Sequence, residues 1–220
     1  MRTIKISSLM LLLLSLVFAS CGDDEENEAV SSDNTEQIEE VHDYVDLGLP
    51  SGVKWATCNV GASCPEDYGD YFAWGEIQPK SSYDEENSKT YGKKIDDISG
   101  DSLYDAACYN WGGKWRMPTE EETNELFGKD CIIINSTQNG VYGILVISRI
   151  NDNSIFLPAS GRRDGTSLYN VGKSGYLWSS TPFWDSRNLQ AYCFIFSGDC
   201  SYSNSRDSRY SGFTVRPVQD

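Results

Sequence analysis

The sequence predicts an α+β fold for residues 44–220, and three observations lead to this prediction. Helical signals fall in the first half of this region, whereas short apolar and β-branched segments bounded by turn residues fill the second half. The chain has 19 glycines and 7 prolines, which indicates many turns. All six tryptophans lie in this region, which has the length of one domain with a substantial core. Segregated helices and strands favour α+β over alternating α/β.

The first half carries the expected helices. A short helix is expected over residues 102–110, before a pair of glycines. A second begins after Thr119, because Thr119 and Glu122 have the spacing of a capping box and Pro118 restricts the residue before it to extended conformations; it should end at Gly128. Three short strands are also expected here, at residues 44–49, 53–58 and 71–75.

The second half of this region is predicted to form strands. Asn139 and Gly140 form a hairpin-type turn signal between two β-branched runs. The strands are expected at residues 131–135, 142–150, 154–157, 176–179, 189–196 and 213–218.

Residues 1–20 have the pattern of a cleaved signal peptide. Arg2 and Lys5 precede an apolar run over residues 9–19, which is shorter than the ~20 residues that cross a bilayer. Small residues follow at its end, as a signal peptidase requires. The alternative is a short membrane helix that is retained.

The stretch Phe18-Ala19-Ser20-Cys21 resembles a bacterial lipobox, although Phe18 departs from the small aliphatic residue that is usual there. The resemblance implies that Cys21 is lipidated and becomes the new N-terminus, so that the membrane is a partner of the protein through this lipid. Several acyl chains would be needed, since one gives only marginal membrane binding.

Residues 21–43 form an acidic segment without Lys or Arg, and we expect a solvated, disordered tether. Acids directly after a lipidated cysteine resemble the signal that sends lipoproteins of Bacteroidetes-type bacteria to the outer membrane. This implies a lipid-anchored protein that faces the cell exterior. The alternative is a plain spacer.

The charge balance argues against nucleic acid as a partner. The chain has 18 basic and 33 acidic residues, a net charge of −15. Ten of the acids lie in the tether, so the domain itself is only moderately acidic. Phosphate binding needs clustered cations, which this pattern lacks.

The cysteines other than Cys21 suggest disulfides, because an even number in an exported domain favours pairing. Fifteen connectivities are possible. Cys58 with Cys64 and Cys193 with Cys200 could close small loops, which would leave Cys108 with Cys131. A zinc site is the rival, but no CxxC spacing occurs and the one histidine lies in the tether, so no metal is expected.

Five segments, in this order, resemble the Fibrobacter succinogenes major paralogous domain. This family is similar in fold to C-type lectins, formylglycine-generating enzymes and the variable proteins of diversity-generating retroelements. The resemblance implies a C-type-lectin-like fold in which the first and last strands pair and second-half loops build a ligand face. It implies a binding scaffold without naming a ligand. The segments are residues 45–56, 69–75, 115–119, 176–181 and 212–218.

A polar and aromatic stretch near the C-terminus lies where the variable proteins display ligand-contacting side chains. Tyr, Trp and Arg are enriched at binding hot spots, and aromatic rings also suit sugars. The alternative is that these side chains cover the core. The candidate ligand-binding residues are Trp184, Asp185, Arg187, Tyr202, Asn204, Arg206, Arg209 and Tyr210.

The sequence predicts a non-catalytic protein without a cofactor, which binds a glycan or protein ligand. A domain without histidine excludes Ser-His-Asp and Cys-His chemistry. Nothing singles out acid pairs such as Glu76 with Asp67, or Asp185 with Asp199, for glycoside hydrolysis. The alternative is a structural or accessory subunit of a surface assembly, followed by an oxidase or hydrolase. Formylglycine-generating enzymes keep a copper-binding cysteine pair near the C-terminus, to which Cys193 and Cys200 could correspond at a wider spacing.

The calcium-binding triplets of lectins do not occur in the sequence, and residues 151–153 read as a β-turn. The segment Asp101-Ser102-Leu103 resembles a bacterial O-glycosylation acceptor, but a helix N-cap explains it equally well. Arg216 is expected to support the C-terminal strand through an ion pair. The expected core residues of the family-like segments are Trp55, Trp74, Trp115, Arg116 and Trp178.

Overall fold

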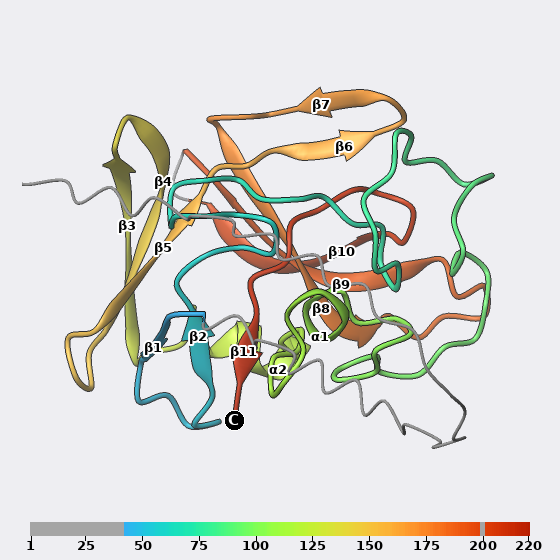
Figure 1. Ribbon diagram of the computed structural model, residues 1–220. Helices are drawn as coiled ribbons and strands as arrows, with labels where there is room; N and C mark the ends of the chain where they lie inside the picture. Colours follow the sequence, from blue (N-terminus) through green and yellow to red (C-terminus); the bar gives the residue numbers. More distant parts are fainter. Residues whose placement is uncertain (1–41, 199–200) are drawn as a thin grey trace, which may run out of the picture. The chain divides into compact units, whose positions relative to one another are not determined.

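The computed structural model describes residues 42–198 and 201–220, which belong to one compact unit, Ile38–Asp220. Small antiparallel sheets dominate this part of the chain, and it contains two short helices (Figure 1). The predicted α+β class is therefore confirmed. No helix found there is long and apolar enough to span a bilayer. The predicted signal peptide, Cys21 and most of the predicted tether lie outside the described residues.

Helix α1 (Ala106–Trp111) begins later than the sequence suggests. Its N-cap is Asp105, whose Oδ1 accepts hydrogen bonds from the N–H groups of Ala107 and Cys108. The predicted start at residue 102 is wrong, because Asp105 satisfies the first free N–H groups of the helix and residues 102–104 form a turn before it.

Helix α2 (Glu120–Glu125) begins as predicted. Thr119 Oγ1 accepts from the Glu122 N–H at 3.2 Å, and the Glu122 side chain accepts from the Thr119 N–H at 2.8 Å. The capping box is therefore confirmed. The helix ends at Glu125, with Leu126 as its C-cap, before the predicted stop at Gly128.

The ends of the domain meet in one sheet, with β2 (Lys54–Ala56) between β1 (Tyr44–Asp46) and β11 (Val218–Gln219). Trp55 lies opposite Val45 on one side and Val218 on the other. The expected direct pairing of the first and last strands is thus replaced by pairing through β2. Residues 213–217 do not form a regular strand; Phe213 makes an isolated bridge to Phe72, which is what remains of the strand expected at 71–75.

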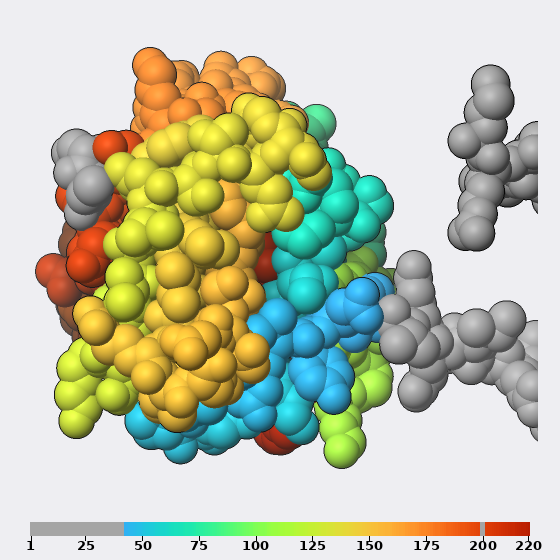
Figure 2. All heavy atoms as spheres, turned by 90° about the vertical axis from the view of Figure 1, so that its left-hand side faces the viewer, coloured from blue at the N-terminus to red at the C-terminus, as the bar shows by residue number. Residues whose placement is uncertain are grey.

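The second sheet is a meander of β3 (Cys131–Gln138), β4 (Val141–Ser148) and β5 (Ser154–Pro158). Asn139 and Gly140 connect β3 to β4 with φ angles of 48° and 85°, both in the left-handed region, which confirms the predicted hairpin turn. This sheet forms much of the face turned toward the viewer in Figure 2, where residues 131–158 are yellow to amber.

The third sheet has β9 (Gln190–Ser197) between β8 (Ser174–Pro182) and β10 (Tyr202–Ser208). A hairpin of β6 (Arg162–Asp164) and β7 (Ser167–Tyr169) stands beside it. Strands β6, β7 and β10 were not predicted from the sequence. These strands are short or mostly polar and lack the apolar alternation that marks a half-buried strand.

Two hydrophobic clusters lie on opposite sides of the third sheet, because neighbouring side chains of a strand point to opposite faces. Leu177 and Phe194 belong to the first cluster, whereas Trp178 and Cys193 belong to the second. The predicted core tryptophans are confirmed as buried: Trp55, Trp74, Trp115 and Trp178.

Two arginines differ from their predicted roles. Arg116 is half-buried rather than in the core, and it pairs with Glu122 at 2.7 Å and Asp220 at 2.7 Å. Arg216 is fully buried without a carboxylate partner in the described residues, so the predicted ion pair is wrong. Its guanidinium instead donates to Asn59 Oδ1 at 2.8 Å and to the carbonyl of Phe156 at 3.1 Å. Burial lowers the pKa of Arg216 to about 10.

Candidate functional site

Three surface loops converge on the side chain of Arg209. Its guanidinium lies 4.2 Å from the ring centroid of Trp74. Nη1 donates to the carbonyls of Lys93 at 2.9 Å and Thr90 at 3.4 Å, and Nε donates to that of Gln190 at 3.1 Å. The assignment of Arg209 to an exposed ligand face is wrong, because the side chain is buried. Burial lowers its pKa to about 10.

Arg209 thereby fixes loops from distant parts of the chain. Its own N–H donates to Leu189 at 2.9 Å, and its carbonyl accepts from the Trp74 N–H at 2.8 Å. The N–H of Gly92 also donates to the carbonyl of Asn188 at 3.1 Å. The Arg209 side chain and these backbone groups therefore hold three segments together: residues 90–93, 188–190 and 209–210. This limits the conformational entropy that the segments would lose on binding a ligand.

Asp185 shapes the loop between β8 and β9. Its Oδ1 accepts from the N–H groups of Arg187 at 2.8 Å and Asn188 at 2.6 Å, and Asn188 has a left-handed φ of 56°. These backbone hydrogen bonds lower the pKa of Asp185. The carboxylate predicted to contact a ligand therefore organises its own turn.

Aromatic and basic side chains lie on this fixed frame, and we call them the Trp184 surface: Tyr91, Trp184, Arg187 and Tyr210. Tyr91 and Tyr210 are half-buried. Trp184 is 53% exposed and Arg187 is exposed. The rings of Tyr91 and Tyr210 lie 5.2 Å apart, tilted by 59°. Burial raises the pKa of Tyr91.

Arg206, Asn204 and Tyr202 alternate along β10 and so share one face of the strand. The Arg206 guanidinium lies 4.2 Å from the Phe183 ring, next to Trp184 in the chain. Asn204 instead donates to Glu120 Oε1 at 2.9 Å and to Asn124 Oδ1 at 2.8 Å, on α2.

Tyr202 lies at the far end of this row. Its ring is stacked with that of Phe127 at 5.6 Å, yet 45% of the residue is exposed. The eight candidate residues thus separate into the Trp184 surface with its supporting Asp185, a row along β10, and the buried Arg209. Only part of the predicted face is free to contact a ligand.

Comparisons of the chain with protein-family models, curated proteins and solved structures gave no match. The resemblance to the Fibrobacter succinogenes major paralogous domain accordingly stays a prediction.

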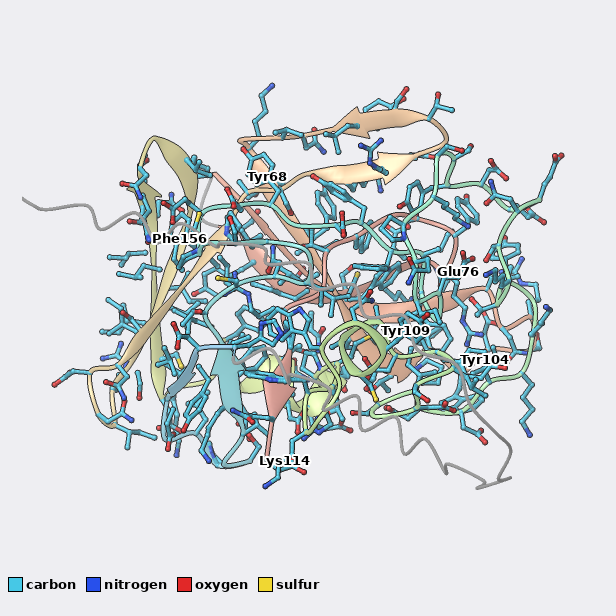
Figure 3. All side chains as sticks on the ribbon, viewed as in Figure 1. Tyr68, Glu76, Tyr104, Tyr109, Lys114 and Phe156 are labelled. Atoms are coloured by element: carbon cyan, nitrogen blue, oxygen red, sulfur yellow. The ribbon has the colours of Figure 1, made fainter. Side chains whose placement is uncertain are left out.

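The described acids of the pairs considered for glycoside hydrolysis make local structural contacts. Glu76 is buried, pairs with Lys80 at 3.0 Å and accepts from the Lys89 N–H at 2.9 Å; it is labelled in Figure 3. Asp67 accepts from the Ser63 hydroxyl at 2.7 Å. Asp199 lies outside the described residues. No group of three or more metal-ligating side chains occurs in the part of the chain that the structure describes.

The described cysteines all carry free thiols in the structure: Cys58, Cys64, Cys108, Cys131 and Cys193. Burial raises the pKa of Cys193, which disfavours the reactive thiolate. Cys200, its predicted partner, lies outside the described residues. Disulfide formation stays a prediction.

The histidine assigned to the tether packs against the domain. The His42 ring stacks on Trp111 with centroids 3.7 Å apart and meets the edge of Trp115 at 6.1 Å. It lines a pocket of about 260 Å³ with Cys58 and Asp43 among its neighbours. The premise that the domain lacks histidine is therefore wrong, because His42 is part of its packing.

Two contributors to the site were missed from the sequence. Tyr91 lies far from the predicted stretch, and Phe183 directly precedes its first residue, Trp184. An aromatic residue directly before a glycine in a polar loop, Tyr91-Gly92, is the signal that could have identified the first.

Proposed function

We propose that this protein is a non-catalytic, lipid-anchored cell-surface protein whose domain binds a glycan or protein ligand through the Trp184 surface. The observation that carries the proposal is the exposure of Trp184 and Arg187 on loops held by the buried Arg209. Rigid aromatic side chains offer large contact area at a small entropic cost, and an arginine adds directional hydrogen bonds.

A C-type-lectin-like fold is part of this proposal. Small antiparallel sheets, long irregular loops and the meeting of both domain ends at β2 support it. The irregular segments between residues 57 and 105 and between 183 and 189 supply the surface, while the sheets provide a fixed base. Such a division suits a scaffold whose specificity lies in its loops.

The proposed cellular location rests on the sequence. A leader over residues 1–20, lipid on Cys21 and the acidic segment to residue 43 support anchoring in the outer membrane with the domain toward the exterior. Metabolic labelling with a clickable fatty acid tests it: label should enter the chain and be lost in Cys21→Ser. Equal label in both would contradict lipidation at this residue.

A glycan array probed with the full chain tests binding, followed by affinity measurements on each hit. Trp184→Ala and Tyr210→Ala should each weaken binding by about 30-fold, as expected for a hot-spot aromatic. The matched control is Tyr109→Ala on α1, since Tyr109 is 51% exposed but belongs to another element (Figure 3).

Affinities within twofold of the parent in both variants, with the fold intact, would reject the Trp184 surface as the binding site. If no glycan binds, photoreactive groups placed next to Trp184 should crosslink a protein ligand at the cell surface. Loss of this crosslink in Trp184→Ala would show that the ligand of the Trp184 surface is a protein.

A further inference from the structure

Arg209 carries a buried positive charge that the surrounding structure leaves incompletely hydrogen-bonded. Its Nε and Nη1 donate to backbone carbonyls, but Nη2 has no hydrogen-bond acceptor among the described residues. Arg216 is equally buried, yet its Nε, Nη1 and Nη2 each donate to an oxygen atom. Burial lowers the pKa of Arg209 only to about 10, so the guanidinium stays charged at neutral pH. A buried charge is costly unless it is both paired and hydrogen-bonded, and Arg209 is neither in full.

Two exposed arginines lie on the same loops. The guanidinium of Arg206 is held 4.2 Å from the ring of Phe183. The N–H of Phe183 donates at 3.1 Å to the carbonyl of Gln190, which also accepts from Arg209 Nε. Arg187 belongs to the loop that begins at Phe183, and both Arg187 and Arg206 are exposed. Three guanidinium groups are therefore gathered around one short loop.

The nearby acids do not pair with the exposed arginines. Asp185 accepts from two N–H groups of its own turn, and Asp207 pairs with Arg162 at 3.2 Å. No ion pair of Arg187 or Arg206 occurs in the described part of the chain. The net charge of −15 belongs to the whole chain, and charges more than about 8 Å away are largely screened at physiological ionic strength. The loop therefore has a local excess of positive charge.

We infer that the ligand of the Trp184 surface is an acidic glycan, whose carboxylate is bound by Arg187 and Arg206. This inference rests on the proposed function. A guanidinium matches a carboxylate with two parallel hydrogen bonds, and the position of Arg206 over the Phe183 ring reduces the entropy lost on binding.

The aromatic part of the surface favours a sugar over an acidic peptide. Trp184 is 53% exposed, and its flat indole offers an apolar face to the C–H face of a pyranose ring. The carboxylate of the same sugar can then lie against the neighbouring arginines. The buried charge of Arg209 adds a favourable field beneath it, because the protein interior screens charge less than water does.

Calorimetric titration of the full chain with matched oligosaccharides tests the inference. The probes are oligogalacturonate, oligomannuronate and a hyaluronan oligosaccharide, each paired with its neutral twin in which the carboxylates are reduced to alcohols. At least one acidic probe should bind, and on the order of 10- to 100-fold more tightly than its neutral twin, as expected for one or two charge-assisted hydrogen bonds.

Substitution of the exposed arginines tests which residues read the charge. Arg187→Gln and Arg206→Gln should each narrow the ratio of acidic to neutral affinity by about tenfold. Arg187→Lys keeps the charge but loses the planar fork, and should retain part of the ratio. Arg149→Gln is the matched control: Arg149 is exposed after β4, on another sheet, and its loss changes the net charge equally.

Equal affinity for the acidic and neutral twins, lost for both in Trp184→Ala, would overturn this inference and leave the proposed function intact. Failure of every acidic probe to bind would also overturn it, as would capture of a protein ligand at this surface. A preference for the acid that persists in Trp184→Ala and in both glutamine variants would reject the inference and the proposed site together.

Discussion

Replacing Arg209 by leucine should destabilise the domain by about 3–5 kcal/mol. The substitution removes the guanidinium hydrogen bonds to the carbonyls of Thr90 and Gln190, which keep backbone donors, so that each loss costs about 0.5–1.5 kcal/mol. It also removes a cation–π contact with Trp74 worth about 2 kcal/mol when desolvated. The Lys93 carbonyl adds little because Lys93 is exposed and water can reach it. Removal of a buried charge offsets part of this loss, which sets the upper bound.

Urea unfolding followed by circular dichroism measures this change, and hydrogen exchange of residues 183–190 reports whether the loop loosens as its anchor disappears. Arg187→Leu is the control, since Arg187 is exposed on the same loop and its loss should change stability by less than about 0.5 kcal/mol. If Arg209→Leu lost under about 1 kcal/mol with unchanged exchange, the view that Arg209 holds the loops would be refuted.

Three further outcomes are expected. Asp105→Asn keeps one acceptor for α1 but sets an amide donor against the N–H groups of Gly100 and Met117, and should cost about 2–3 kcal/mol in urea unfolding. Gly175→Ala would place a Cβ 2.1 Å from the Phe196 ring; a Tm that does not fall would contradict this packing, whereas about 1–3 kcal/mol of destabilisation is expected. Burial raises the pKa of Tyr71 from 10 to about 12, so the stability gained by keeping this phenol protonated is complete below pH 10 and is lost as the pH rises toward 12. A pH series of unfolding should show this loss in the parent and a smaller one in Tyr71→Phe.

Local signals in the sequence predicted local structure well. The capping box at Thr119 and Glu122 and the turn at Asn139-Gly140 involve residues a few positions apart, so their geometry is set by the nearby chain. The tryptophans were placed in the core because large aromatic side chains between apolar neighbours are strongly driven from water.

Features that depend on distant contacts could not be predicted in the same way. Arg209 bonds to carbonyls 116 and 119 residues away, and Arg216 to one 160 residues away, so neither burial has a local signature. Strand β10 forms because its backbone pairs with β9, although most of its side chains are polar. His42 was assigned by the composition around it, whereas its position is set by Trp111 on a remote helix.

The placement of β1 at the outside of its sheet has a mechanical consequence. Any tension transmitted from the N-terminal side reaches first the His42–Trp111 stack and then the hydrogen bond from the Thr57 N–H to the Asp43 carbonyl. Next in line is the Tyr44–Ala56 pair at the open end of the β1–β2 hairpin. These contacts would break one after another, starting from the N-terminal side, while β2 stays hydrogen-bonded to β11. The first extension under a force on the N-terminal side would therefore detach β1 from β2. Little of that force would reach the loops around Arg209.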